Sequence, residues 1–233
     1  MKLATWNVNS IRQREGHVRR WLGRVQPDVL LLQEIKCETA AFPALAFADL
    51  GYRAAVVGQK AYNGVAALCR CPFEVTQTAL PGLPPDDAQA RYIELAAGDM
   101  RIAGIYLPNG NSGGPAGFAY KLAWMDALAA RAEALLAEDT PLVIAGDFNV
   151  CPTDADLSPG ALPPGDALVH PDTRLWTFWD YQAAAWPRDI GLRIDHALLS
   201  PTLAERLTAA MPDRQERGED APSDHVPVLV EID

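Results

Sequence analysis

The sequence predicts an α/β fold in which two packed mixed β-sheets are flanked by helices. Two observations support this prediction. Short apolar or alternating runs of strand length recur along the chain, and some follow one another directly while others are separated by helical patterns. In addition, no stretch reads as a linker and no internal repeat is present. The 233 residues are therefore expected to form one catalytic domain spanning residues 1–233.

The first half of the chain alternates predicted strands with one clear helix. Residues 11–25 predict a helix because Ile11, Val18 and Leu22 recur near helical spacing. Pro27 then ends that helix. The apolar run 28–33 is typical of a strand covered on both faces. The remaining predicted strands here are 2–9, 52–58, 62–70 and 73–80, followed by a hairpin of 90–97 and 100–107.

The second half begins with the longest predicted helix, residues 117–138. Apolar residues recur there every three or four positions, which indicates a helix with one apolar face. The recurring residues are Phe118, Leu122, Met125, Leu128 (or Ala129), Ala132 and Leu135-Leu136. A buried strand, LVIAG, follows Pro141, and residues 152–171 read as irregular. The last predicted elements are a strand at 192–199, a helix at 201–210 and a strand at 226–232.

Composition excludes several classes of protein. The chain is 49% hydrophobic, which is too apolar for a disordered segment. No run approaches the roughly 20 apolar residues of a membrane span. The four cysteines, including Cys69 and Cys71, lack the second ligand pair of a zinc site and read as buried free thiols. With no signal peptide pattern at the N-terminus, we expect a cytoplasmic protein.

The net charge of −10 argues against a nonspecific nucleic-acid binder, because neutralising phosphates requires Lys and Arg. The charge is not evenly spread, however. Residues 1–36 hold seven basic and three acidic side chains. An acidic protein can therefore still present a basic face to DNA, and the negative total does not exclude a DNA substrate.

Polar residues occur at the ends of five predicted buried strands. These residues are Asn7, Glu34, Asp147 with Asn149, Asp195, and Asp224 with His225. A single Asp or Asn after a strand is most often a turn residue, and Asp224 could equally be a helix cap. Their joint occurrence favours a site. Carboxylate and amide oxygens suit Mg²⁺ or Mn²⁺, so this set favours metal-assisted hydrolysis of a phosphate ester.

Six motifs in order resemble the exonuclease III family of abasic-site DNA repair nucleases, within the endonuclease/exonuclease/phosphatase superfamily. They are TWNVNSIR, LLQEIKC, YLPNG, AGDFNV, GLRIDHALLS and SDHVPV, and they cover nearly the whole chain. ARYIEL and TFWDYQ resemble the DNA-repair branch in particular. The resemblance implies a four-layer α/β sandwich. It also implies Mg²⁺-dependent cleavage 5′ to abasic sites, with 3′→5′ exonuclease and 3′-end-processing activity.

The resemblance also implies individual roles. Glu34 would hold the metal, supported by Asn7 and Asp224. Asp147 would orient or deprotonate the attacking water, with Asn149 on the phosphate. His225, oriented by Asp195, and Tyr106 would contact the scissile phosphate.

Aromatic residues and two arginines form a second group of candidates. Trp176, Phe178, Trp179 and Tyr181 crowd six positions, which is either core packing or a pocket for a flipped abasic sugar. The family places that pocket at Phe178, Trp179 and Leu192. Arg91 and Arg193 are candidate substrate contacts, and the alternative for both is a structural ion pair.

Two departures from the family stand out. The family carries a helical region between GDFNV and the TFWDYQ-like segment, whereas residues 150–176 here hold only proline-rich turns. Either that region has been lost or residues are missing near Val169-His170, and a break or poor order is expected at 165–171. Where the family has Asn-Arg-Gly, this chain has Asp189-Ile190-Gly191. The loss of a basic residue predicts weak, salt-sensitive binding to duplex DNA.

The sequence therefore predicts a Mg²⁺-dependent DNA repair nuclease, with Mn²⁺ as a possible substitute. The expected partner is double-stranded DNA with abasic sites or blocked 3′ ends, with no membrane, and the protein is expected to act as a monomer at a bacterial nucleoid. Two alternatives stay open. One is a metal-dependent phosphatase or phosphodiesterase acting on a small phosphorylated molecule or lipid. The other is an inactive DNA-binding module of the same fold.

Overall fold

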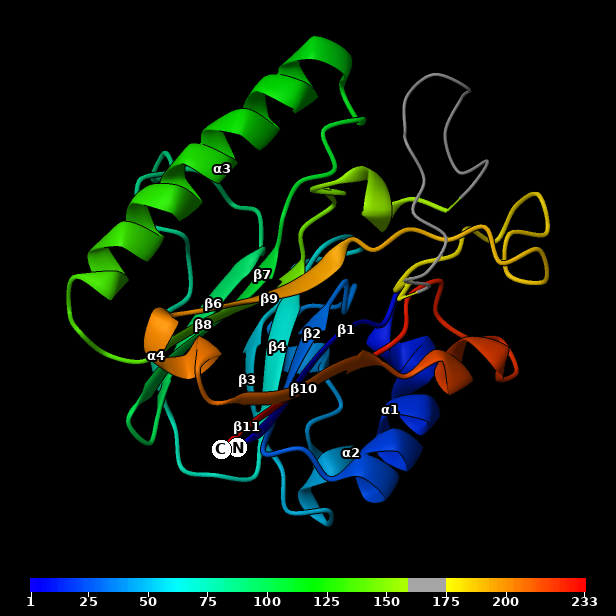
Figure 1. Ribbon diagram of the computed structural model, residues 1–233, viewed down its shortest axis with the longest axis horizontal. Helices are drawn as coiled ribbons and strands as arrows, with labels where there is room; N and C mark the ends of the chain where they lie inside the picture. Colours follow the sequence, from blue (N-terminus) through cyan, green and yellow to red (C-terminus); the bar gives the residue numbers. More distant parts are fainter. Residues whose placement is uncertain (159–174) are drawn as a thin grey trace.

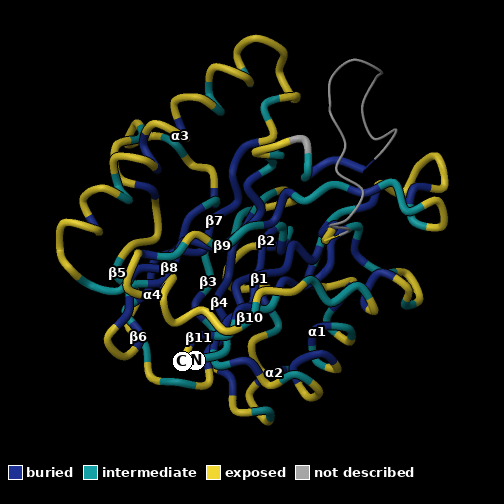
Figure 2. Tube along the Cα trace, in the orientation of Figure 1, coloured by how far each residue is buried: buried dark blue, intermediate teal, exposed yellow. Residues whose placement is uncertain are grey.

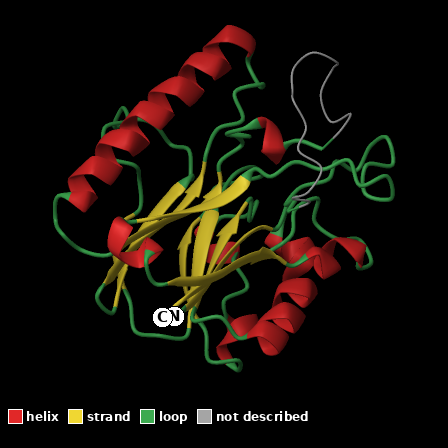
Figure 3. Ribbon diagram, in the orientation of Figure 1, coloured by secondary structure: helices red, strands yellow, loops and turns green. Residues whose placement is uncertain are grey.

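The computed structural model describes residues 1–158 and 175–233 and contains two mixed β-sheets packed face to face (Figures 1 and 3). The six-stranded sheet has the order β10-β11-β1-β2-β4-β3 and the five-stranded sheet the order β5-β6-β7-β8-β9. Strands β1 and β2 pair in parallel, as do β7 and β8, and the other neighbours are antiparallel. The predicted fold class is confirmed.

The elements follow one another in chain order. The strands are β1 (Lys2–Asn7), β2 (Val29–Gln33), β3 (Arg53–Val57), β4 (Val65–Cys69), β5 (Glu74–Gln77), β6 (Tyr92–Ala97), β7 (Met100–Tyr106), β8 (Leu142–Asp147), β9 (Asp195–Leu199), β10 (Leu207–Pro212) and β11 (Val228–Ile232). The α-helices are α1 (Ile11–Val25), α2 (Leu45–Ala48), α3 (Gly114–Leu136) and α4 (Pro201–Ala204). Short 3₁₀ turns are η1 (Thr39–Ala41), η2 (Asp154–Asp156) and η3 (Arg214–Gly218).

Three apolar layers separate the sheets and helices, and the strands are the most buried part of the chain (Figure 2). Alternate residues of each strand face opposite sides of the sheet. Leu31 of β2 therefore meets Ile102 of β7 between the sheets. Its neighbour Leu30 packs with Trp21 of α1 on the outer face of the first sheet. Burial on both faces explains why the central strands are continuous apolar runs.

One prediction about an element is wrong, and a second is right only in part. The predicted helix 201–210 ends at Ala204, and residues 207–212 instead form the edge strand β10, which pairs with β11. The long helix α3 exists, but only part of the predicted apolar stripe is buried: Phe118 is 55% exposed and Leu122 is 46% exposed. Leu128 and Leu135 of the stripe do face the sheet, together with Trp124, which the stripe did not include. Because α3 is rich in alanine, its two faces differ little in hydropathy, and the sequence pattern did not distinguish them.

Helix α3 is joined to the second sheet by one buried ion pair. Arg131 donates two hydrogen bonds to the Glu94 carboxylate, at 2.9 and 3.0 Å, and the Glu94 side chain is fully buried. Burial alone would raise the pKa of Glu94, but hydrogen bonds from Arg131, Thr76 and Tyr92 hold it below its ordinary value. The carboxylate therefore depends on its donors to remain charged inside the protein.

Replacing Arg131 with Met is expected to lower the free energy of unfolding by about 3–5 kcal/mol at pH 7, because it leaves a buried charge without its partner. The pKa of Glu94 is depressed in the folded state, so the stability that the pair contributes is present above the unfolded pKa of about 4.3 and is lost as pH falls through the folded pKa. Urea unfolding at pH 7 and pH 4 measures both effects, and the loss should shrink at pH 4. Arg101→Met, which removes a more exposed ion pair with Glu138, is the control and should cost under about 1 kcal/mol. Equal losses in the two variants would contradict the assignment.

Two further expectations concern the order of residues 165–171 and the lack of a membrane span. Residues 165–171, where a break or poor order is expected, lie outside the described residues. In the part of the chain that is described, no helix combines the length and apolar character needed to cross a membrane.

Candidate active site

One end of the two sheets collects the polar residues predicted at strand ends. Asn7 is the last residue of β1, and Glu34 comes directly after the parallel neighbour β2. On the second sheet, Tyr106 and Asp147 end the parallel strands β7 and β8 in register with each other. Parallel strands end at the same edge of a sheet, so these four side chains converge.

The other two site residues, Asp195 and His225, lie at or before the starts of the antiparallel strands β9 and β11. Asp195 begins β9 and pairs with Asp147 across the ladder. His225 lies three residues before β11, held by a bridge to Phe178 and by a hydrogen bond from the Trp6 indole to its carbonyl oxygen. The sandwich thus places a histidine among three carboxylates.

Asn7 connects the carboxylates of the two sheets. Its Nδ2 donates to Glu34 Oε1 and to Asp147 Oδ2, both at 2.9 Å, and its Oδ1 accepts the Asn9 backbone N–H at 3.0 Å. Asn7 is fully buried. One amide group therefore holds two like charges at a fixed separation, which opposes their mutual repulsion.

Asp147, Asp195 and His225 form a buried cluster. His225 Nδ1 lies 2.8 Å from Asp195 Oδ2, and His225 Nε2 lies 3.7 Å from Asp147 Oδ2. Burial raises the pKa of Asp147 to about 7, although His225 opposes that shift. Burial alone would lower the pKa of His225, but the two carboxylates raise it well above its ordinary value. The imidazole therefore carries a positive charge at neutral pH.

Glu34 is the more accessible carboxylate of the site, with 20% of its side chain exposed. Its Oε1 accepts hydrogen bonds from Asn7 and from the Tyr106 hydroxyl, the latter at 2.9 Å, and Lys36 lies 2.8 Å from Oε2. Burial alone would raise the pKa of Glu34, but Asn7 and Lys36 hold it below its ordinary value. Burial and the charge of Glu34 raise the pKa of Tyr106. Its phenol therefore stays protonated and donates a hydrogen bond to Glu34.

The donor set fits a hard divalent cation. Carboxylate oxygens of Asp147 and Asp195 lie within 4.8 Å of each other, next to the His225 ring. Asp195 Oδ1 is buried and has no hydrogen-bond partner among the described residues. Such an oxygen is costly to bury unless something neutralises it. Together with the accessible Glu34, these oxygens are the ligands that Mg²⁺ or Mn²⁺ prefers.

Asn149 and Asp224 lie at the margins of this site. The backbone N–H of Asn149 donates to Asp147 Oδ1 at 2.9 Å, while its side chain donates to the Leu107 carbonyl at 2.8 Å. Asp224 accepts a hydrogen bond from Asn9 Nδ2 at 3.1 Å. In this arrangement Asn149 orients the Asp147 carboxylate, and Asp224 joins the loop before β11 to the loop after β1.

The predicted aromatic group divides into Phe178, which contacts His225, the core residues Trp176 and Trp179, and the half-exposed Tyr181. The Phe178 ring meets the His225 ring edge-on, with centroids 4.9 Å apart, and Phe178 pairs with Leu192 through the backbone. Trp179 is fully buried and packs with Trp176, Ala185 and Val226, so its ring lies in the core and does not line an open pocket. Of the two readings that the sequence left open, core packing therefore holds for Trp176 and Trp179.

Charged residues near this segment are paired with one another. Arg193 forms an ion pair with the buried Asp156. Asp189 accepts a hydrogen bond from the Trp179 indole and forms an ion pair with Arg214 at 2.8 Å. The extra negative charge at Asp189 is therefore balanced locally.

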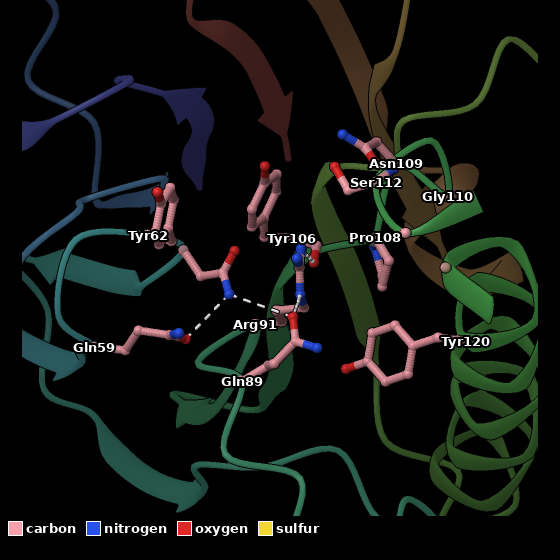
Figure 4. Close-up of a pocket in the computed structure, with 13 residues that line it drawn as sticks. Gln59, Tyr62, Gln89, Arg91, Tyr106, Pro108, Asn109, Gly110, Ser112 and Tyr120 are labelled. Atoms are coloured by element: carbon pink, nitrogen blue, oxygen red, sulfur yellow. Dashed lines mark hydrogen bonds between the residues drawn. The ribbon is translucent and has the colours of Figure 1, made fainter.

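A pocket of about 630 Å³ opens beside Tyr106 (Figure 4). Arg91 lies in it, with its guanidinium 4.6 Å from the centre of the Tyr106 ring and its Nη1 bonded to the Tyr106 carbonyl. Gln59, Gln89 and Tyr120 line the same pocket. Arg91 therefore contacts the ring and the backbone of Tyr106 and also lines the pocket.

Sequence reasoning missed three residues that support the site. Asn9 bonds to Asn7, Asp224 and Lys36, and Lys36 pairs with Glu34. Lys121 of α3 donates to the carbonyls of Asn109 and Asn149. Both lysines lie next to predicted motifs or on the predicted helix, but only the fold shows that they turn toward the site.

A match to the Endonuclease/Exonuclease/phosphatase family spans residues 4–225. The chain belongs to this family. Haemophilus influenzae "Exodeoxyribonuclease III" is 30% identical over the full length of both chains. Among solved structures, the "3'-5' exonuclease (NExo)" of Neisseria meningitidis has a TM-score of 0.91 at 37% identity, covering both chains completely. An "AP Endonuclease" from Archaeoglobus fulgidus has a TM-score of 0.87 at 32% identity, covering 100% of this chain and 99% of that one.

These relatives confirm the resemblance to the exonuclease III type and the two-sheet fold. The family is metal-dependent, and the Asp147-Asp195-His225 cluster of this chain agrees with that chemistry. The relatives with printed activities act on DNA.

Proposed function

We propose that this protein is a Mg²⁺-dependent DNA repair nuclease that hydrolyses the phosphodiester 5′ to abasic sites and also processes 3′ ends as a 3′→5′ exonuclease. The observation that carries the proposal is the cluster at the sheet ends, where a charged His225 faces Asp147 at 3.7 Å, beside the accessible Glu34. The names of the relatives support DNA as the substrate. Because every site residue comes from one chain, a monomer suffices for catalysis.

Glu34 would hold the divalent ion, with Asn7 and Asp224 as supporting residues. When bound, that ion supplies positive charge beside the phosphate oxygens and so lowers the barrier to attack by a nucleophile. Asn7 keeps the Glu34 and Asp147 carboxylates apart at fixed positions through its bridging amide. Tyr106 holds the other face of Glu34 and offers its hydroxyl at the same edge.

Asp147 would accept a proton from the attacking water. Burial raises the pKa of its carboxyl toward neutrality, where a general base is most effective. The N–H groups of Asn7 and Asn149 fix its two oxygens, so the basic lone pair keeps one direction. The new bond joins the water oxygen to phosphorus as the bond to the leaving oxygen breaks.

His225 would stabilise the charge that develops on the phosphate. Asp195 holds the ring through Nδ1, which leaves Nε2 as a donor directed at the site. Phe178 covers one side of the ring and limits access of water. A cation held in a buried, prearranged position stabilises a developing anion more than water does.

Arg91 and Phe178 are the residues we propose for substrate contact, together with Leu192, which is partly exposed beside Phe178. Trp179 and Arg193 would act indirectly. Trp179 packs against Val226, the neighbour of His225, and Arg193 pairs with the buried Asp156. The free state of all four cysteines agrees with action in a reducing cytoplasm.

The proposal is tested with three substrates and two metal conditions. A duplex with one abasic-site analogue, a duplex with a 3′-phosphate and a small phosphate ester are each incubated with Mg²⁺ and with EDTA. We expect a nick 5′ to the abasic site and release of the 3′-phosphate, both only with Mg²⁺. Turnover of the small ester alone would indicate a phosphatase, and DNA binding without turnover would indicate an inactive binding module.

A further inference from the structure

Arg14 is a buried arginine that no part of the proposed chemistry uses. It lies in the first turn of α1 and is 8% exposed. Among the described residues it has no carboxylate within ion-pair distance, whereas Arg20 and Arg24 of the same helix both pair with Glu216. Its Nε also has no hydrogen-bond partner in the described chain. A cation at a helix N-terminus opposes the helix dipole, so this residue is poorly placed for stability alone.

The Arg14 guanidinium joins three separate segments next to the site. Nη1 donates to the carbonyl of Asn9 at 2.6 Å, in the loop after β1. Nη2 donates to the Tyr181 hydroxyl at 3.1 Å and to the Pro222 carbonyl at 3.0 Å. Tyr181 in turn donates to the same Pro222 carbonyl at 2.9 Å. One carbonyl thus receives two hydrogen bonds from two different segments.

Both loops held in this way carry residues of the site. The first runs from Asn7 to Ser10, and Asn9 and Ser10 have φ values of 44° and 91°, in the left-handed region that side chains disfavour. The second leads from Pro222 through Asp224 to His225. Ser223 Oγ donates to the Asn7 carbonyl at 2.7 Å, so the loops also touch directly beneath the site. A strained loop keeps its shape only when surrounding contacts determine it.

We propose that Arg14 and Tyr181 together are positioning residues that set the spacing between Asn7 and His225 for the proposed nuclease reaction. The inference rests on the proposed function for its kinetic consequence. Neither residue is placed on the reacting atoms. Arg14 acts through the carbonyls of Asn9 and Pro222, and Tyr181 acts through the carbonyl of Pro222. Arg217, whose guanidinium lies 5.2 Å from the centre of the Tyr181 ring, holds the tyrosine from its other side.

The test compares Arg14→Met with Arg24→Met on the abasic-site duplex with Mg²⁺. Both variants remove a guanidinium from α1, but within residues 1–158 and 175–233 the side chain of Arg24 bonds to Asp213 and Glu216, outside these two loops. Misplacing catalytic groups by about 1 Å can cost about 100-fold. We expect kcat to fall about 10- to 100-fold in Arg14→Met with KM within about threefold, and to be unchanged in Arg24→Met. An unchanged kcat, or a loss confined to KM, would overturn the proposal.

Two further measurements guard against a variant that merely folds poorly. Tyr181→Phe removes one hydroxyl, and Arg14→Lys keeps the charge but cannot reach all three acceptors. The double variant Arg14→Lys/Tyr181→Phe should lose no more activity than the less active of the two single variants. If the two residues had independent roles, the losses would multiply.

Hydrogen exchange separates this inference from the nuclease assignment because it requires no activity. The backbone amides of residues 223–226 should exchange faster in Arg14→Lys than in the wild type or Arg24→Met. Equal exchange in all three proteins would reject the positioning role even if the enzyme cleaves DNA. Faster exchange in Arg14→Lys, in a protein that does not cleave DNA, would support the role of Arg14 in joining the two loops and would reject the proposed nuclease function.

Discussion

Replacing Asp147 with Asn is expected to lower kcat on the abasic-site duplex by at least about 1,000-fold while leaving the fold intact. A general base contributes roughly 10²–10⁴-fold, and an amide cannot accept the proton. The substitution keeps the size of the side chain and one oxygen, so either the Asn7 amide or the Asn149 N–H can still be satisfied. The measurement is single-turnover cleavage at pH 7.5, with the thermal unfolding midpoint recorded alongside.

The matched control for this variant is Asp126→Asn on the exposed face of α3. It makes the same chemical change far from the sheet ends and should keep full activity. An Asp147→Asn protein that unfolds at the wild-type temperature and still cleaves at more than a tenth of the wild-type rate would remove Asp147 from its role as base.

Replacing Asp195 with Asn is the second large effect, with an expected fall in kcat of about 10²–10⁴-fold. The carboxylate lies 2.8 Å from His225 Nδ1 and contributes most among the charges that raise the pKa of the ring. An amide in its place removes that charge and can present a donor to Nδ1, which favours the wrong ring tautomer. His225 would then be uncharged, and turned, over part of the neutral pH range.

Coupling to His225 distinguishes this role from a structural one. Residues that act as a unit are strongly non-additive. The Asp195→Asn/His225→Asn double variant should therefore be no less active than His225→Asn alone. Asp180→Asn, at an exposed carboxylate whose described bond is to the Gln182 backbone, serves as the control and should remain active. Multiplied losses in the double variant would mean that Asp195 acts on something other than the ring.

The sequence predicted those parts of the fold whose pattern is local. Helix α1 spans Ile11–Val25 as expected, because its apolar stripe is clear and Pro27 ends it. Residues 207–212 were missed because a short run such as LTAAMP suits either helix or strand. Its state is decided by the distant strand β11, which no local pattern shows. The same reason explains the buried Trp179, whose neighbours Val226 and Ala185 are known only from the fold.

The sequence predicted those site residues that lie at the ends of apolar strands. Asn7, Glu34, Asp147 and Asp195 each follow or begin an apolar run, and the sheets bring them together. The sequence could not show that Asn7 uses its nitrogen to bridge two carboxylates, since that requires the register between two sheets. Arg14 was invisible for a similar reason: in the sequence it is one of several arginines on an amphipathic helix.

Strand β1 lies between β2 and β11, so the first strand of the chain is completed by the last. During synthesis on the ribosome, β1 waits with one edge unpaired until nearly all other residues have been added. His225 emerges just before β11. A partly made chain therefore holds Glu34 and Asp147 but lacks His225, so its site is incomplete. The order of the strands delays the chemistry until the chain is long enough to close the sheet.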